Sequence, residues 1–238
     1  MRVHPLVVVP LIASLASVLP LAVQDSHAER EVEGFRVLVA KELLAHDPAR
    51  TELALRELQD QLYRVTRVVP DKALAELRKV PIWMSAESKT TCAAYHPSRE
   101  WLAQHEGYDP RMAEAVEIGN LQHFLDWTHE QPFMLLHELA HAFHHRVLGY
   151  GHRGILDAFA RAKADARWSQ VLRSDGSHEK HYALTDEKEW FAEASESFFG
   201  TNDFFPFVHA ELHELDAQAD DMLAEAFGAP KFAPRKKG

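Results

Sequence analysis

The sequence predicts an α+β domain, and three observations lead to this fold class. Short runs rich in β-branched and aromatic residues, at 34–39 and 80–84, indicate strands. Stretches with helical periodicity, most of them after residue 120, predict helices. One of these helices, at 131–149, is apolar almost all round, and most of its polar residues are histidine or glutamate. A chain of 238 residues is long enough to bury a sizeable core, and no internal repeat divides it.

Residues 1–28 have the pattern of a signal peptide. A short basic start precedes an apolar run at 6–23, and Ser26 and Ala28 place small residues at the −3 and −1 positions of a cleavage site before Glu29. The alternative is a retained membrane anchor. We therefore expect an exported protein, periplasmic or extracellular, whose mature part at 29–238 is a single domain. It stays attached to the membrane if the leader is not cleaved.

The N-terminal half alternates strands and helices. The strand at 34–39 leads to a helix at 47–65, which Asp47 and Pro48 begin, and to a short helix at 72–78. Pro81 limits the strand at 80–84 to a strand start or an edge position. The polar, aromatic stretch at 85–107 has two interpretations that the sequence leaves open. It supplies an edge strand that receives an extended peptide, or it is a surface loop followed by a strand.

The remaining elements follow in order along the chain. A strand is expected at 112–118 and a short helix at 120–127. Beyond the apolar helix we expect a helix at 155–168, an exposed turn-rich insertion at 173–180, an extended piece at 182–186, and helices at 187–199 and 208–227. The Pro- and Lys-rich tail at 229–238 is expected to fray.

The apolar helix carries the motif His137-Glu138-Leu139-Ala140-His141, or HExxH. Residues four apart lie on the same face of a helix, so His137 and His141 direct two imidazoles at one point. Glu138 lies beside that point. Two histidines that hold a zinc ion with an open position, and a carboxylate that takes a proton from water, form a catalytic zinc site.

Composition narrows the site and the partners. The formal net charge of −10 argues against nucleic acid as a partner, because phosphate neutralisation needs a basic surface. The chain has 16 histidines and a single cysteine, Cys92, so a zinc site must use histidine and carboxylate ligands. Cys92 is either a thiolate that caps the metal in a latent form or a buried inert thiol.

A catalytic zinc site needs a third protein ligand. The extended motif HExxHxxGxxH is absent, because His144 stands at its glycine position and Val147 at its last histidine position. The alternative is a glutamate on a second helix. The helix at 187–199 offers Glu189 and Glu193, four apart among apolar neighbours, where carboxylates are costly unless paired or bound to metal.

HELAH, then Tyr182, then Glu189 seven residues later and Glu193 four residues after that, resembles the gluzincin group that contains anthrax lethal factor and the Pro-Pro endopeptidases. The match covers about 131–200, and the N-terminal half carries no motif of that group. The resemblance implies a zincin-like metallopeptidase domain, with a small mixed sheet packed on the HExxH helix and further C-terminal helices.

The resemblance also implies roles for individual residues. His137, His141 and Glu189 would be the ligands of one Zn²⁺ per chain, and Glu138 would polarise the water. Tyr182 would donate to the oxyanion of the tetrahedral intermediate. Glu193 would lie behind the ligands, where it could orient a histidine.

The expected function is that of an exported zinc metallopeptidase with a peptide or protein substrate. Two alternatives stay open: a catalytically weak zinc-binding domain for peptides or cell-wall material, and a zinc hydrolase for a non-peptide amide. His144 and His145 are expected at the site rim or in solvent, and His209 and His213 on a helix surface.

Overall fold

The computed structural model describes residues 26–231, and this part of the chain starts with a tight hairpin. Strands β1 (His27–Val32) and β2 (Phe35–Ala40) pair antiparallel, and Glu33 and Gly34 turn between them with φ of 52° and 80°. Positive φ at both turn positions matches the right-handed twist of the strands that the turn joins. The strand at 34–39 is thus confirmed as β2. The sequence did not indicate β1, none of whose residues is buried.

Most of the predicted signal peptide lies outside the described residues. Its last two residues, His27 and Ala28, lie in β1 opposite Ala40 and Val39. Cleavage before Glu29 would therefore leave only residues 29–32 to pair with β2.

The main sheet is mixed and has five strands in the order β1-β2-β3-β5-β4. Strand β3 (Ile82–Met84) pairs parallel with β2 and with β5 (Ala115–Ile118). Strand β4 (Ala93–His96) pairs antiparallel with β5 and forms one edge. In the 85–107 segment the structure has a loop at 85–92 and then the edge strand β4, an arrangement that fits both interpretations of this segment. The strand expected at 112–118 is shorter than predicted, because Met112 ends the 3₁₀ turn η1 (Pro110–Met112) and residues 113–114 form a turn.

The two faces of the sheet are covered unequally. One face packs on helices α3 (Pro48–Val68), α4 (Asp71–Leu77) and α7 (Met134–Phe143) through the main hydrophobic core. The other face holds a small cluster beneath α5 (Arg99–Gln104) and η1, built from Leu38, Trp83, Leu102, Met112 and Ala115. The short helices α2 (Lys41–His46) and α6 (Leu121–Trp127) lie at the periphery.

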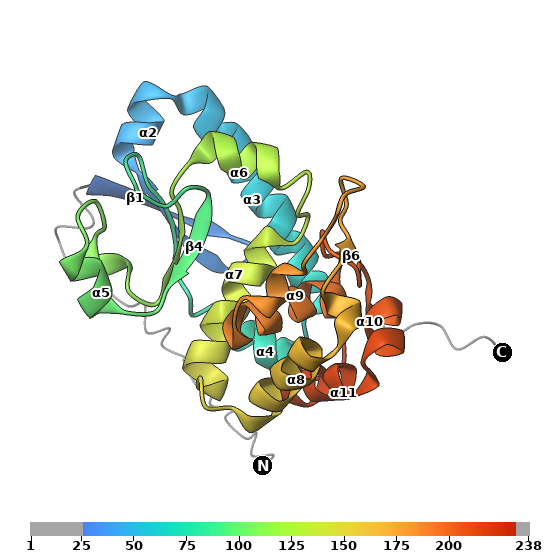
Figure 1. The fold of residues 1–238 in the computed structure, drawn as a ribbon. Coiled ribbons are helices and arrows are strands. Elements are labelled where there is room, and N and C mark those ends of the chain that lie inside the picture. The colour runs from blue at the N-terminus through green and yellow to red at the C-terminus, as the bar shows by residue number, and fades with distance from the viewer. Residues whose placement is uncertain (1–25, 232–238) are drawn as a thin grey trace, which may run out of the picture.

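Helix α7 is the HExxH helix, and it lies between the two halves of the chain (Figure 1). The sheet and the N-terminal helices, blue to green, flank it on one side. The C-terminal helices, in gold to red, flank it on the other: α8 (Arg153–Ala164), α9 (Glu187–Phe199), α10 (His209–Leu215) and α11 (Ala217–Phe227). The α+β class and the packing of a small mixed sheet on the HExxH helix are therefore confirmed.

Several helices end earlier than the periodicity predicts. Helix α7 stops at Phe143 and continues as the π-helical turn η2 (His144–Leu148), and Gly149 ends it with φ of 77°. The helix expected at 155–168 ends with a separate 3₁₀ turn, η3 (Ala166–Trp168). The helix expected at 208–227 is divided at Asp216, whose side chain accepts from the Ala219 N–H and begins α11.

Two segments expected to be irregular or extended have structure of their own. The insertion at 173–180 forms most of a small hairpin of β6 (Val171–Leu172) and β7 (His178–Glu179). The piece at 182–186 is not extended, because it starts with the 3₁₀ turn η4 (Tyr182–Leu184).

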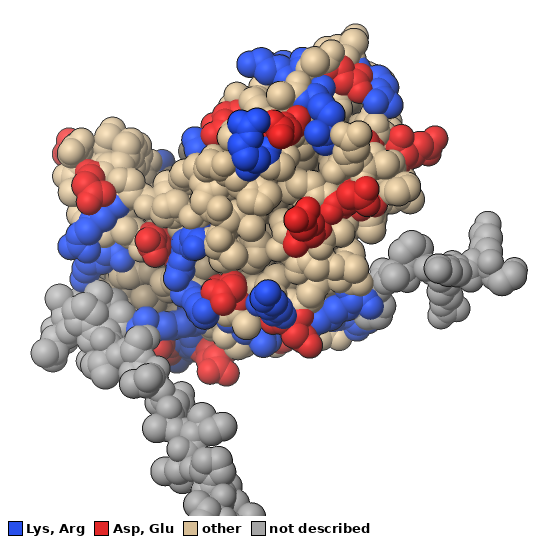
Figure 2. Space-filling model, turned by 90° about the horizontal axis from the view of Figure 1, so that it is seen from below, with Lys and Arg blue, Asp and Glu red and all other residues tan. Residues whose placement is uncertain are grey.

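The surface charge is mixed. Figure 2 shows basic and acidic side chains interspersed on the face that it draws, with no uniform basic area on that face. Among residues 26–231, no helix combines the length and the apolar character that crossing a bilayer requires.

Candidate metal centre

Two side chains of α7 and one of α9 converge at one point. The Nε2 atoms of His137 and His141 lie 3.1 Å apart. Glu189 of α9 places Oε2 at 3.2 Å from His137 Nε2 and 3.5 Å from His141 Nε2. His137 is buried, and the side chains of His141 and Glu189 are 14% and 19% exposed. The cluster is therefore largely shielded from solvent.

The distances among these three atoms fit a tetrahedral metal ion. Zinc binds imidazole nitrogen and carboxylate oxygen at roughly 2.0–2.2 Å, so two tetrahedral ligands lie about 3.3–3.6 Å apart. The observed separations of 3.1, 3.2 and 3.5 Å differ from this range by a few tenths of an ångström or less. A ligand set of two imidazoles and a carboxylate is typical of zinc sites that keep a position open for water.

The second nitrogen of His137 is held by Glu196, a residue that the sequence analysis did not single out. His137 Nδ1 lies 2.8 Å from Glu196 Oε1 and 3.6 Å from Glu193 Oε1, so only Glu196 is at hydrogen-bonding distance. A carboxylate in this position fixes the tautomer that leaves Nε2 free to bind metal. Glu196, rather than Glu193, is therefore the carboxylate placed to orient His137.

The capping of α9 fixes where these carboxylates point. Asp186 accepts hydrogen bonds from the N–H groups of Lys188 and Glu189, which begins the helix at Glu187. Positions 189, 193 and 196 then follow one face at spacings of four and three. Spacing alone could have identified Glu196 as a third member of this face.

The carboxylates behind the ligands are buried and close together. Burial raises the pKa values of Glu193, Glu196 and Asp203, and the charges of neighbouring carboxylates raise those of Glu193 and Glu196 further. Gln131 donates to Glu196 Oε1 at 2.8 Å and Asn202 to Glu193 Oε2 at 2.9 Å. Within residues 26–231, Glu196 Oε2 has no hydrogen-bond partner. A cation next to His137 would offset the repulsion between these carboxylates.

The titration of His137 and Glu189 has the same origin. Burial alone lowers the pKa of His137, but hydrogen bonds to Glu189 and Glu196 outweigh it and hold that pKa well above its usual value. Burial alone raises the pKa of Glu189, and its hydrogen bonds to the two histidines lower it overall. Without a metal these carboxylates hold a proton on the imidazole, which a zinc ion would displace.

Glu138 lies between the metal ligands and the sheet edge. Its Oε2 accepts the backbone N–H of Tyr95 in β4 at 2.7 Å. The Tyr95 hydroxyl in turn lies 2.9 Å from His145 Nδ1 in the turn after α7. Tyr95 thus connects the edge strand both to α7 and to the turn η2 that follows it.

A cavity of about 430 Å³ opens onto His137 and Glu138. Tyr182, 48% exposed, lines it together with the β6–β7 hairpin residues Arg173 and Glu179. Burial and the Glu189 charge raise the pKa of Tyr182, so its hydroxyl keeps its proton for donation. Arg173 donates to Asp203 at 3.2 Å. The 173–180 segment, predicted to be an exposed insertion, thus lies at the cavity, which its sequence did not indicate.

Cys92 and the other histidines singled out in the sequence do not join the three converging side chains. Cys92 lines the cavity at His137 and Glu138, but it is buried at 3.4 Å from Met134 Sδ, and burial and Glu138 raise the pKa of its thiol to about 12. This favours the inert thiol over a capping thiolate. His144, expected at the site rim or in solvent, is instead fully buried, and within residues 26–231 neither of its ring nitrogens has a hydrogen-bond partner. His209 and His213, expected on a helix surface, both bond Asp220 at 2.6 Å.

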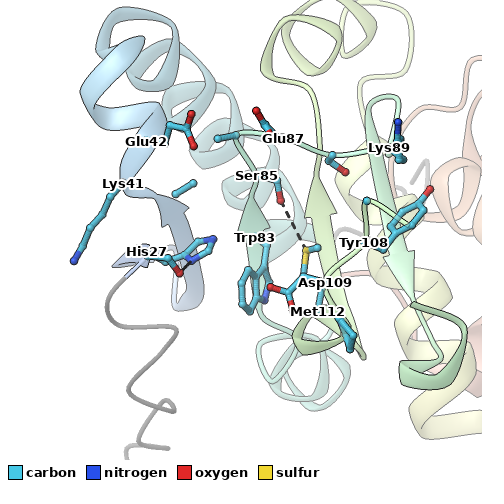
Figure 3. A pocket seen from close by; sticks show the side chains of 16 residues that line it. His27, Lys41, Glu42, Trp83, Ser85, Glu87, Lys89, Tyr108, Asp109 and Met112 are labelled. Carbon is cyan, nitrogen blue, oxygen red and sulfur yellow. Dashed lines mark hydrogen bonds between the residues drawn. The ribbon is translucent and has the colours of Figure 1, made fainter. Parts of the chain in front are cut away.

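A larger cavity, about 850 Å³, lies beside the small cluster on the other sheet face (Figure 3). His27, Trp83 and Asp109 line it, and Ser85 Oγ lies 3.8 Å from Met112 Sδ there. The Asp109 carboxylate is paired with Arg111. The two groups of three or more potential metal ligands found among residues 26–231 both contain His137, so neither lies at this cavity.

Searches of protein families, curated proteins and solved structures found no match to this chain.

Proposed function

We propose that this chain is a zinc-dependent metallopeptidase of the gluzincin type. The observation that carries the proposal is the convergence of His137 Nε2, His141 Nε2 and Glu189 Oε2 within 3.5 Å of one another, beside the carboxylate of Glu138. The order HExxH, tyrosine, glutamate along the chain, which resembles the gluzincins, supports it.

Each side chain around the metal centre has a task in peptide hydrolysis. When bound, zinc lowers the pKa of a water molecule towards ~7 and polarises the scissile carbonyl. Glu138 takes the proton from the attacking water and passes it to the leaving amine. Tyr182 donates its hydroxyl hydrogen to the oxygen on which negative charge develops. Glu196 holds the His137 ring in register through Nδ1.

The edge strand favours a peptide over other amides. Tyr95 in β4 contacts Glu138 directly, so a free sheet edge runs next to the general base. An extended peptide adds to such an edge through main-chain hydrogen bonds. A non-peptide amide would leave that edge unused.

Metal content and hydrolysis together test the proposal. We expect about one zinc per chain in the wild type by elemental analysis, loss of zinc in Glu189→Ala, and retention in the matched control Glu187→Ala from the same helix turn. The wild type should cleave peptides of a mixed library. Cleavage should be absent when a chelator is added, and Glu138→Gln should not cleave the library.

The outcomes separate the alternatives. Zinc without hydrolysis of any peptide would favour the binding domain, and cleavage of a non-peptide amide alone would favour the amidase. A wild-type protein that takes up no zinc would refute the metallopeptidase assignment.

A further inference from the structure

A groove continues from the metal centre along the edge strand. We define the β4 groove as the cavity of about 680 Å³ that is lined by residues 89–98 with Trp101, Tyr108 and Trp127. Cys92, Ala93 and Trp127 line both this groove and the cavity at His137 and Glu138. The groove therefore shares three lining residues with the cavity at His137 and Glu138, which places it next to the metal centre.

Part of the β4 backbone along the groove faces away from β5. In β4 the carbonyls of Cys92 and His96 accept from Gly119 N–H at 2.8 Å and Glu114 N–H at 2.7 Å on the β5 side. Because backbone groups alternate along a strand, those of Ala93 and Tyr95 point away from β5. Tyr95 N–H meets Glu138 there. The outer edge of β4 thus offers main-chain groups to an extended ligand.

The walls of the groove are aromatic. Trp101 and Trp127 are 45% and 44% exposed, whereas the other three tryptophans are at most 3% exposed. Trp101 stacks on His105 at 3.9 Å and meets the Tyr108 ring edge-on at 5.0 Å, so the ring is held in place while one side stays open.

The groove has little charge of its own. Lys89 is the sole Lys, Arg, Asp or Glu among the residues that line it. Apart from Lys89, no Lys, Arg, Asp or Glu of the lining would pair with a charged side chain, whereas rigid aromatic rings bind large apolar groups well.

We propose that the β4 groove selects the substrate: it binds the residues on the N-terminal side of the scissile bond and prefers a large apolar or aromatic side chain against Trp101. This inference rests on the proposed peptidase function. The direction follows because antiparallel pairing is the more stable arrangement. A peptide antiparallel to β4 enters at the Trp101 end and runs towards the metal. At about 3.3 Å per residue, the Trp101 wall lies roughly two to three residues before the scissile bond.

The test combines cleavage-site mapping with binding. Products of a random peptide library are sequenced by mass spectrometry. Otherwise identical peptides with Ala, Leu, Phe, Asp or Lys at each position before and after the cleaved bond are then compared by kcat/KM. We expect Leu and Phe to exceed Ala by about 10- to 100-fold at one position two or three residues before the bond. Trp101→Ala should lower kcat/KM for the Leu and Phe peptides to about the value that the same variant shows for the Ala peptide. Tyr63→Ala, an equally exposed aromatic on α3, is the matched control.

A binding arm distinguishes failure of the groove from failure of the peptidase function. The same peptides, fluorescently labelled, are titrated into Glu138→Gln protein, which should bind the Leu and Phe peptides more tightly than the Ala peptide. The double variant with Trp101→Ala should lose this difference in affinity. Hydrolysis without this preference, or with a preference only after the scissile bond, would overturn the groove assignment alone. Binding with the preference but no hydrolysis by the wild type would keep the groove and overturn the peptidase. Neither binding nor hydrolysis would overturn both.

Discussion

The choice between Glu196 and Glu193 as the carboxylate that orients His137 can be tested by one substitution. Glu196→Gln keeps the shape of the side chain and an oxygen that can accept from His137 Nδ1, at 2.8 Å in the wild type, but it removes the negative charge. The metal ligands themselves are unchanged. The substitution therefore tests the charge behind the ligand.

The expected loss in zinc affinity is substantial. Mutating the outer partner of a ligating histidine typically weakens metal binding by about 10- to 100-fold, or roughly 1.4–2.7 kcal/mol. Glu193→Gln should weaken it by less than about 3-fold, because Glu193 Oε1 lies 3.6 Å from Nδ1 and makes no hydrogen bond to it.

The metal-free protein should also be less stable. Without zinc, Glu196 helps to hold a proton on buried His137 through the 2.8 Å contact with Nδ1. Removing one partner of a buried charge pair is strongly destabilising, so Glu196→Gln should unfold at a lower temperature than the wild type without zinc. With zinc it should gain less stability than the wild type, because stabilisation by a ligand falls with its affinity.

Competition with a chromophoric chelator measures the zinc affinity, and differential scanning calorimetry with and without zinc measures the stability. The reasoning is refuted if Glu193→Gln weakens zinc binding as much as Glu196→Gln does, or if Glu196→Gln leaves the affinity unchanged.

Four further predictions follow from the site. Glu138→Gln should retain zinc by elemental analysis and lose at least about 100-fold in kcat, and full activity would contradict its role as the base. Tyr182→Phe should lose about 100-fold in kcat with little change in KM, because its hydroxyl acts on charge that develops only in the transition state; a change confined to KM would contradict this. Tyr95→Phe removes the 2.9 Å hydrogen bond to His145 and should raise KM more than it lowers kcat, as steady-state kinetics would show. Burial lowers the pKa of His144 from 6.5 to about 4. As pH falls from about 6.5 towards 4, the unfolded chain therefore binds a proton at His144 before the folded chain does, and the fold loses stability. In thermal melts across this range, the unfolding temperature of His144→Phe should change less with pH than that of the wild type.

Local chemistry explains why much of the metal centre is visible in the sequence. The i, i+4 spacing of His137 and His141 places them on one face of any helix that forms. Asp186 is a strong N-cap, so the start of α9 and the position of Glu189 within it could be predicted to the residue. The strands at 34–39 and 80–84 were visible for the same reason, since they are short runs of β-branched residues.

Other elements depend on contacts that no local pattern reveals. None of the residues of strand β1 is buried, and only its pairing with β2 makes it a strand. The position of β4 at the sheet edge depends on β5 pairing with β3 rather than with another strand. The hairpin that brings Arg173 to the cavity is polar and turn-rich, a composition that predicts exposure and not proximity to a site.

The sequence by itself determined the donors of the candidate site: two imidazoles and a glutamate on two helices, with a second glutamate beside them. Only the tertiary structure decided that Glu196 rather than Glu193 reaches His137, and that the outer edge of β4 lies against Glu138. The reason is that helical periodicity fixes which residues share a face, whereas the rotation and depth of α9 against α7 are set by side-chain packing across the whole core.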